Sequence, residues 1–195
     1  MVSKLLLAAQ ECCIRAIEDQ SEADIIAGLF IHYYKIKAGI GVHKSPELYG
    51  AFTTDPYSHT PGHRGAQQPG MTGQVKEDIL VRRAELGISV RRGKLHFNPP
   101  NIQKGEFINE PQLIEFIDVN GKFCHVHLNQ DSLFFTCCQV PVIYSVSEIQ
   151  KILVEYKDGS FEEVSSNHLN EITSQKIFYR TGEIKQIQVS ITRTA

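Results

Sequence analysis

The sequence predicts an α+β protein, with helices in residues 1–100 and antiparallel β-structure in residues 101–195. Apolar side chains recur every three or four positions in residues 3–38 and 73–86, which is typical of amphipathic helices. From about residue 112 onward apolar and polar side chains alternate, which is typical of half-buried strands. We expect the β part to form a sandwich or a jelly-roll fragment.

The chain is expected to open with a helical hairpin. The first helix covers residues 3–18, and its apolar positions are Leu6, Ala9, Cys13, Ile14 and Ile17. Asp19 and Gln20 break the pattern, and Ser21 suits the N-cap of a second helix. That helix should end near Gly39, because glycine suits the position that follows a helix.

A third helix is expected to begin at Thr72 or Gly73 and to end at Leu86, before Gly87. Its predicted buried side is apolar and consists of Val75, Ile79, Leu80 and Leu86. Two short strands, residues 88–90 and 95–97, should then pair through a turn. The Asn-Pro-Pro-Asn segment that follows predicts a domain boundary near residue 100.

Three further hairpins are expected in the second part. Their strands are predicted at residues 113–119 with 122–128, 148–156 with 161–166, and 176–180 with 183–192. Asn120-Gly121 in the first of them suits a type I′ turn. Residues 133–146 should form a longer strand or a pair of strands, in which Pro141 marks a bend or an edge. One helical turn is expected at residues 168–172.

The composition is that of a soluble globular protein, with 42% hydrophobic residues, 22% charged residues and a formal net charge of −2. It offers no electrostatic basis for binding nucleic acid, and no apolar run approaches the roughly 20 residues of a membrane span. The cysteines include two adjacent pairs, Cys12-Cys13 and Cys137-Cys138, which favour reduced thiols. We therefore expect a cytoplasmic protein without nucleic-acid or membrane partners.

Residues 48–83 are the chemically richest stretch, a long loop that leads directly into the third helix. Loops longer than about 12–15 residues are uncommon in compact domains and are often functional. We interpret this loop as one wall of a polar pocket; the alternative is an ordered surface loop. Its candidate binding side chains are Tyr57, His59, His63, Arg64 and Gln68.

The same stretch resembles the C-terminal part of large bacterial carbohydrate-active proteins with a six-hairpin (α/α) toroid. Among these, the cellobiose-phosphorylase-like disaccharide phosphorylases open the last toroid helix with a Thr-Gly pair. A leucine-glycine, a strand, a turn, a strand and a proline follow. Here the pair is Thr72-Gly73, and the unit runs from Leu86 to Pro99. The resemblance covers roughly residues 20–100 and implies that these helices end such a toroid.

The resemblance implies a sugar-binding cleft for an oligo- or disaccharide, with inorganic phosphate as a co-substrate at Thr72-Gly73 and with no cofactor. Free N–H groups at a helix N-terminus favour anions, which agrees with this role. The next residues depart from the phosphorylase pattern, and Gln74 and Lys76 would instead orient a sugar or a water. Glycoside hydrolysis needs two carboxyl groups, for which Glu77 and Asp55 are the candidates.

A six-hairpin toroid contains more helices than the three expected here. The chain is therefore interpreted as the C-terminal portion of a carbohydrate-active enzyme that cleaves glycosidic bonds by hydrolysis or phosphorolysis. Its first two helices would expose apolar faces that a second copy of the chain, or a missing N-terminal part, would cover. We expect little or no activity from this chain alone.

A non-catalytic carbohydrate-binding or interaction module is the alternative. Sugar-binding sandwiches usually present Trp or Tyr platforms, and this chain has no Trp, which favours the loop over the sheet. A zinc site at His125 and His127 is disfavoured, since no fourth ligand stands at a recognisable spacing and Cys137-Cys138 are an awkward donor pair. These histidines are expected on the solvent face of their strand, with Cys124, Val126 and Leu128 inside.

Overall fold

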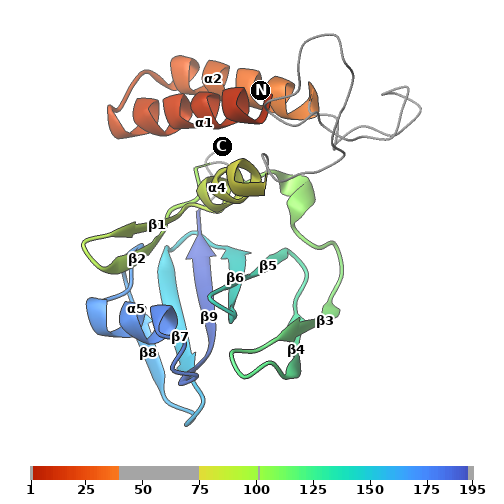
Figure 1. Ribbon diagram of the computed structural model, residues 1–195, viewed down its shortest axis with the longest axis vertical. Coiled ribbons are helices and arrows are strands. Elements are labelled where there is room, and N and C mark those ends of the chain that lie inside the picture. The colour runs from red at the N-terminus through yellow and green to blue at the C-terminus, as the bar shows by residue number, and fades with distance from the viewer. Residues whose placement is uncertain (1, 40–74, 101, 193–195) are drawn as a thin grey trace. The chain divides into compact units, whose positions relative to one another are not determined.

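The computed structural model describes residues 2–39, 75–100 and 102–192, and it is mixed α+β, as predicted (Figure 1). The chain divides into two compact units, residues 1–84 and 85–195. The expected boundary near residue 100 differs from this division by one short hairpin, which belongs to the second unit. None of the helices in the described ranges has the length and apolar character needed to cross a membrane.

The first two helices form the predicted hairpin, α1 (Val2–Glu18) and α2 (Ala23–Gly39), which lie side by side in Figure 1. α1 ends in a Schellman-type turn, in which Gln20 has a φ of 53° and the amide of Ser21 donates to the carbonyl of Ala16. Ser21 therefore belongs to the turn that ends α1, and it is not the predicted N-cap of α2.

A small apolar core joins the helices of the first unit. It contains Leu6 and Cys13 of α1, Tyr33 of α2 and Val81 of α4 (Val75–Glu85). Leu6 and Cys13 are two of the positions predicted from the helical period. The predicted start of α4, at residues 72–73, lies outside the described residues.

Of the predicted buried side of the third helix, Leu86 is buried, but two other positions are not. Ile79 and Leu80, expected inside, are 54% and 47% exposed, whereas Glu77 and Val81 are buried. Glu77, Val81 and Glu85 recur every four residues, so they share one face of the helix. The positions of the apolar residues predicted one buried face, but in the structure the neighbouring face of the helix is buried.

The second unit is built on a five-stranded sheet with the order β5-β6-β9-β7-β8. Its strands are β5 (Ser132–Cys137), β6 (Val140–Val146), β7 (Lys151–Tyr156), β8 (Phe161–Val164) and β9 (Ile184–Ile191). β6 and β9 pair in parallel, so the predicted purely antiparallel sandwich is wrong in its topology. A parallel pair needs a crossover connection, which β7, β8 and the helix α5 (Glu171–Phe178) provide.

α5 occupies most of the segment in which a strand was predicted at residues 176–180. Asn170 caps this helix, because its side chain accepts a 2.8 Å hydrogen bond from the amide of Thr173. Thr173, Ser174 and Ile177 are buried on one face. The prediction of one helical turn at residues 168–172 identified the start of this helix and missed its length.

Two small hairpins accompany the sheet: β1 (Ile88–Arg91) with β2 (Lys94–Phe97), and β3 (Gln112–Ile117) with β4 (Phe123–Leu128). Both were predicted. The turn between β3 and β4 is not type I′, because Gly121 has a φ of 75° and Asn120 has no positive φ. A short 3-10 helix, η3 (Lys104–Glu106), precedes β3.

Alternation along β5 and β6 divides their side chains between two apolar clusters. Val142 and Tyr144 belong to the main core. This core also contains Leu169, Ile177 of α5 and residues of the β1–β2 hairpin. Ile143, on the opposite face, contacts the cluster formed by the inner face of β3–β4. That inner face contains Val126 and Leu128, whereas His125 and His127 are exposed, as predicted.

Candidate functional site

Most of the predicted site residues lie outside the described residues. They are Asp55, Tyr57, His59, His63, Arg64, Gln68, Thr72, Gly73 and Gln74. Lys76 lies in the first turn of α4, where only its backbone is described. Glu77 follows it and is the predicted catalytic residue whose surroundings the structure defines.

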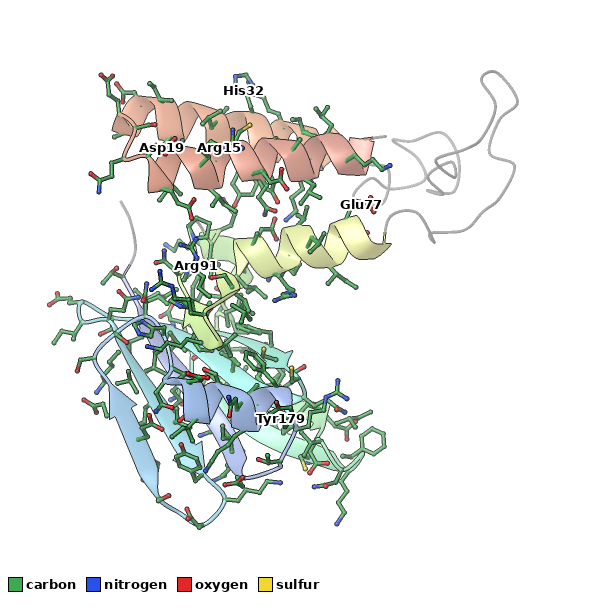
Figure 2. All side chains as sticks on the ribbon, turned by 60° about the vertical axis from the view of Figure 1, so that its left-hand side comes forward. Arg15, Asp19, His32, Glu77, Arg91 and Tyr179 are labelled. Carbon is green, nitrogen blue, oxygen red and sulfur yellow. The ribbon has the colours of Figure 1, made fainter. Side chains whose placement is uncertain are left out.

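Glu77 lies at the N-terminal end of α4 (Figure 2). Its side chain is 4% exposed, and its Oε2 is buried without a hydrogen-bond partner among the residues that the structure describes. Acidic side chains are favoured in the first turn by the helix dipole, yet a buried carboxylate oxygen without a donor is costly. Such groups in native proteins are explained by local strain, a catalytic role, a water or an ion. Among the described residues, no group donates a hydrogen bond to this oxygen of Glu77.

Gln10 of α1 has a related arrangement. Its side chain is 4% exposed, its Nε2 donates a 2.8 Å hydrogen bond to the carbonyl of Val81, and its Oε1 is buried without a partner. Val81 follows Glu77 by one helical turn. The sequence prediction missed Gln10, although its position between Leu6 and Cys13 in the apolar row of α1 was a signal. The described part of the first unit thus buries two acceptor oxygens that lack donors within it.

A second candidate lies in the C-terminal unit. It is a surface hollow of about 350 Å³, lined by Tyr156, Lys157, Asp158, Ser160, Lys176 and Glu183. We call it the β7–α5 hollow, since its residues come from the end of β7, the β7–β8 turn, α5 and the loop before β9. The amide of Lys157 donates a 2.8 Å hydrogen bond to the carbonyl of Glu183. This bond joins the β7–β8 turn to the loop before β9.

Two charged groups of the β7–α5 hollow, Lys176 and Glu183, form an ion pair. The Nζ of Lys176 lies 2.7 Å from a carboxylate oxygen of Glu183 and 5.1 Å from the ring centre of Tyr156. The hydrogen bond between Lys176 and Glu183 raises the pKa of Lys176 and lowers the pKa of Glu183. Hydrogen bonds from the hydroxyl and amide of Ser160 lower the pKa of Asp158. With Lys157, the hollow carries two cations and two anions.

A hydrogen-bond network beside the hollow fixes the orientation of Tyr156. Glu162 of β8 accepts hydrogen bonds from the hydroxyl of Tyr156 at 2.7 Å, the hydroxyl of Thr173 at 2.8 Å and the side-chain amide of Asn170 at 2.8 Å. The network leaves neither the Tyr156 hydroxyl nor Glu162 poised as a nucleophile or base. Of the residues in this network, Tyr156 is the one that lines the hollow.

The described histidines do not form a metal centre. His96 of β2 stacks on His168, and His125 lies 3.5 Å from Glu115 across the β3–β4 hairpin. In the part of the chain that the structure describes, no three His, Cys, Asp or Glu side chains gather in a way that would hold a metal ion. All five cysteines are free thiols.

No protein-family model matches the chain, and no curated protein matches its sequence. The resemblance to six-hairpin carbohydrate-active proteins therefore stands as a proposal.

Proposed function

We propose that this chain is the C-terminal portion of a carbohydrate-active enzyme that acts on glycosidic bonds, as a hydrolase or a phosphorylase. Glu77 is one of its reacting carboxyl groups. The observation that carries the proposal is the buried Oε2 of Glu77, to which no described residue donates a hydrogen bond. Glycosidases require a carboxyl group with a free oxygen beside the scissile bond, and this oxygen fits that role.

The position of Glu77 in α4 supports the same role. The first turn of a helix leaves N–H groups without intrahelical partners, which favours anionic and strongly polar ligand groups. Glu77 stands in that turn, two residues after the helix begins at Val75. A sugar hydroxyl, a water or a phosphate bound there would lie within reach of both the free N–H groups and the carboxylate of Glu77.

The exposed side chains of the helical hairpin support its origin in a larger helical assembly. Leu5, Ile25 and Ile31 are each more than half exposed, and only Tyr33 is buried among the residues of α2. Helices that are apolar on several faces are usually covered by neighbours. On this proposal the chain alone has weak or no activity, and its ligand binding is the property to measure.

A thermal-shift titration tests the role of Glu77. The full chain is heated with cellobiose and other disaccharides, with and without inorganic phosphate, because a ligand that binds the folded state raises the melting temperature. We expect a shift that Glu77→Gln reduces and that the matched variant Asp78→Asn retains in full. Asp78 is the exposed carboxylate next to it. A shift of equal size in Glu77→Gln would contradict the proposal, and a shift that requires phosphate would favour a phosphorylase.

The alternative function is a non-catalytic carbohydrate-binding module. The β7–α5 hollow favours it, because its polar groups lie on the second unit, away in sequence from Glu77. Under this alternative, sugar binding persists in Glu77→Gln.

A further inference from the structure

We propose that the β7–α5 hollow binds a neutral, hydroxyl-rich ligand, namely one or two sugar units. The inference does not depend on Glu77, and it shares with the proposed function only the expectation that the ligand is a carbohydrate. It assigns a binding role to the second unit.

The size and construction of the hollow suit a small ligand. Its volume of about 350 Å³ is at the lower end of ligand pockets, which span roughly 300–1,000 Å³. Its walls are held together by the Lys157–Glu183 backbone hydrogen bond and the Lys176–Glu183 ion pair. The ring of Tyr156 is fixed by the bond from its hydroxyl to Glu162. The site is thus largely formed before a ligand arrives.

The charge balance indicates a neutral ligand. Two lysines and two carboxylates line the hollow, and Lys176 and Glu183 neutralise each other at 2.7 Å. An anion such as phosphate would meet Asp158 and Glu183, and a cation would meet both lysines. A sugar hydroxyl both donates and accepts hydrogen bonds, so it can use acceptors and donors that stand side by side.

Several hydrogen-bonding groups of the hollow have capacity left. Asp158 accepts the amide and hydroxyl of Ser160 on the same oxygen, Oδ1, which leaves Oδ2 to accept from a ligand. The Ser160 hydroxyl donates to Asp158 and keeps its lone pairs. The Nζ of Lys157 makes a 3.8 Å ion pair with Asp118, too long for a direct hydrogen bond. The hollow therefore offers two acceptors and one donor.

Backbone-amide NMR of the full chain tests the inference. The probes are D-glucose, cellobiose and inorganic phosphate, each titrated to the same concentration. We expect both sugars to change the chemical shifts of the amides of residues 157–160 and 183, and phosphate to leave these chemical shifts unchanged. Equal shifts with phosphate, or no shift of these amides with either sugar, would overturn the inference.

Paired variants locate the binding energy. Lys176→Met combined with Glu183→Gln removes the ion pair of the hollow without changing net charge, and sugar affinity should fall at least tenfold. Lys151→Met combined with Glu163→Gln removes another Lys–Glu pair, 3.5 Å apart, between β7 and β8 outside the hollow, and affinity should be unchanged. If the first variant fails to fold, Lys157→Met at an exposed position takes its place. Equal affinity in the hollow variants and the control pair would refute the site.

The Glu77→Gln variant separates this inference from the proposed function. Shifts at residues 157–160 that survive in Glu77→Gln support the hollow, whatever happens at α4. Sugar binding that is lost in Glu77→Gln and retained in the hollow variants supports the proposed function and overturns this inference.

Discussion

The imidazole rings of His96 and His168 lie stacked, with their centroids 4.8 Å apart and their planes 24° apart. Backbone hydrogen bonds hold the two segments together, from Phe97 to Asn167 at 2.7 Å and from Leu169 to Leu95 at 2.9 Å. The segment before α5 is thereby attached to β2, so the two rings have little freedom to separate.

This stacking predicts that mild acid destabilises the second unit. Burial lowers the pKa of His96, and the neighbouring His168, Arg91 and Lys94 lower it further. The folded state therefore favours neutral His96, while the unfolded state takes up a proton as the pH falls through about 6.5. The free energy of unfolding should fall as the pH decreases from about 6.5 to the lower pKa of the folded state.

Urea unfolding at a series of pH values between 7.5 and 5 measures this loss. His96→Gln should flatten the pH dependence, because the variant has no imidazole at this position. His125→Gln, which removes an exposed histidine of β4, is the control and should retain the slope. An unchanged slope in His96→Gln would contradict the prediction.

Gly87 should not tolerate alanine. It has a φ of 66°, and an added Cβ would overlap the carbonyl carbon of Asn98 and the nitrogen of Pro99. We expect Gly87→Ala to destabilise the protein by more than about 3 kcal/mol or to prevent folding. Gly121→Ala is the matched control, because Gly121 has a φ of 75° but nothing within 4 Å of its Cβ position. That control should cost only about 1 kcal/mol.

The carboxylate of Glu162 should be a major contributor to the attachment of α5 to β8. It accepts three side-chain hydrogen bonds, from Tyr156, Thr173 and Asn170. Glu162→Ala leaves these donors without their acceptor and should cost about 2–3 kcal/mol in urea denaturation. Its neighbour on the strand, Glu163, is exposed and pairs with Lys151 at 3.5 Å. Glu163→Ala should change stability by less than about 0.5 kcal/mol.

The hydroxyl of Tyr144, and not only its ring, should contribute to the stability of the protein. This fully buried hydroxyl donates a 2.6 Å hydrogen bond to the carbonyl of Leu86, and burial raises its pKa far above the usual range. Tyr144→Phe keeps the edge-on contacts with Phe97 and Phe135. It leaves a buried carbonyl without a donor and should cost about 1–3 kcal/mol. Tyr179→Phe, at a 76% exposed ring, is the control and should be neutral by chemical denaturation.

Local patterns account for the elements that the sequence predicted well. The helical period identified α1 and α2 to within two residues, and alternation with turn residues identified the hairpins β1–β2, β3–β4 and β7–β8. Glycines at Gly93, Gly121 and Gly159 have positive φ in the turns of these three hairpins. Period and turn chemistry depend on neighbours in the chain, so they are readable without the fold.

The candidate sites were less accessible to sequence reasoning. Glu77 was predicted as a carboxyl group of the site, but the burial of its Oε2 depends on the packing of α4. The β7–α5 hollow was not predicted, because Lys157 and Glu183 are separated by more than twenty positions in the chain. Their contact exists only once the β7–β8 turn meets the loop before β9.

By itself, the sequence determined the α+β class, the helical hairpin and the short-range β hairpins, since these follow from side-chain period and turn residues. Tertiary structure alone decided the parallel pairing of β6 with β9, the helical state of residues 176–178 and the buried face of α4. Each of these depends on partners far away in the chain. The local pattern predicted one helical turn at residues 168–172 and a strand at residues 176–180, whereas the helix continues to Phe178 and buries Ile177 in the main core.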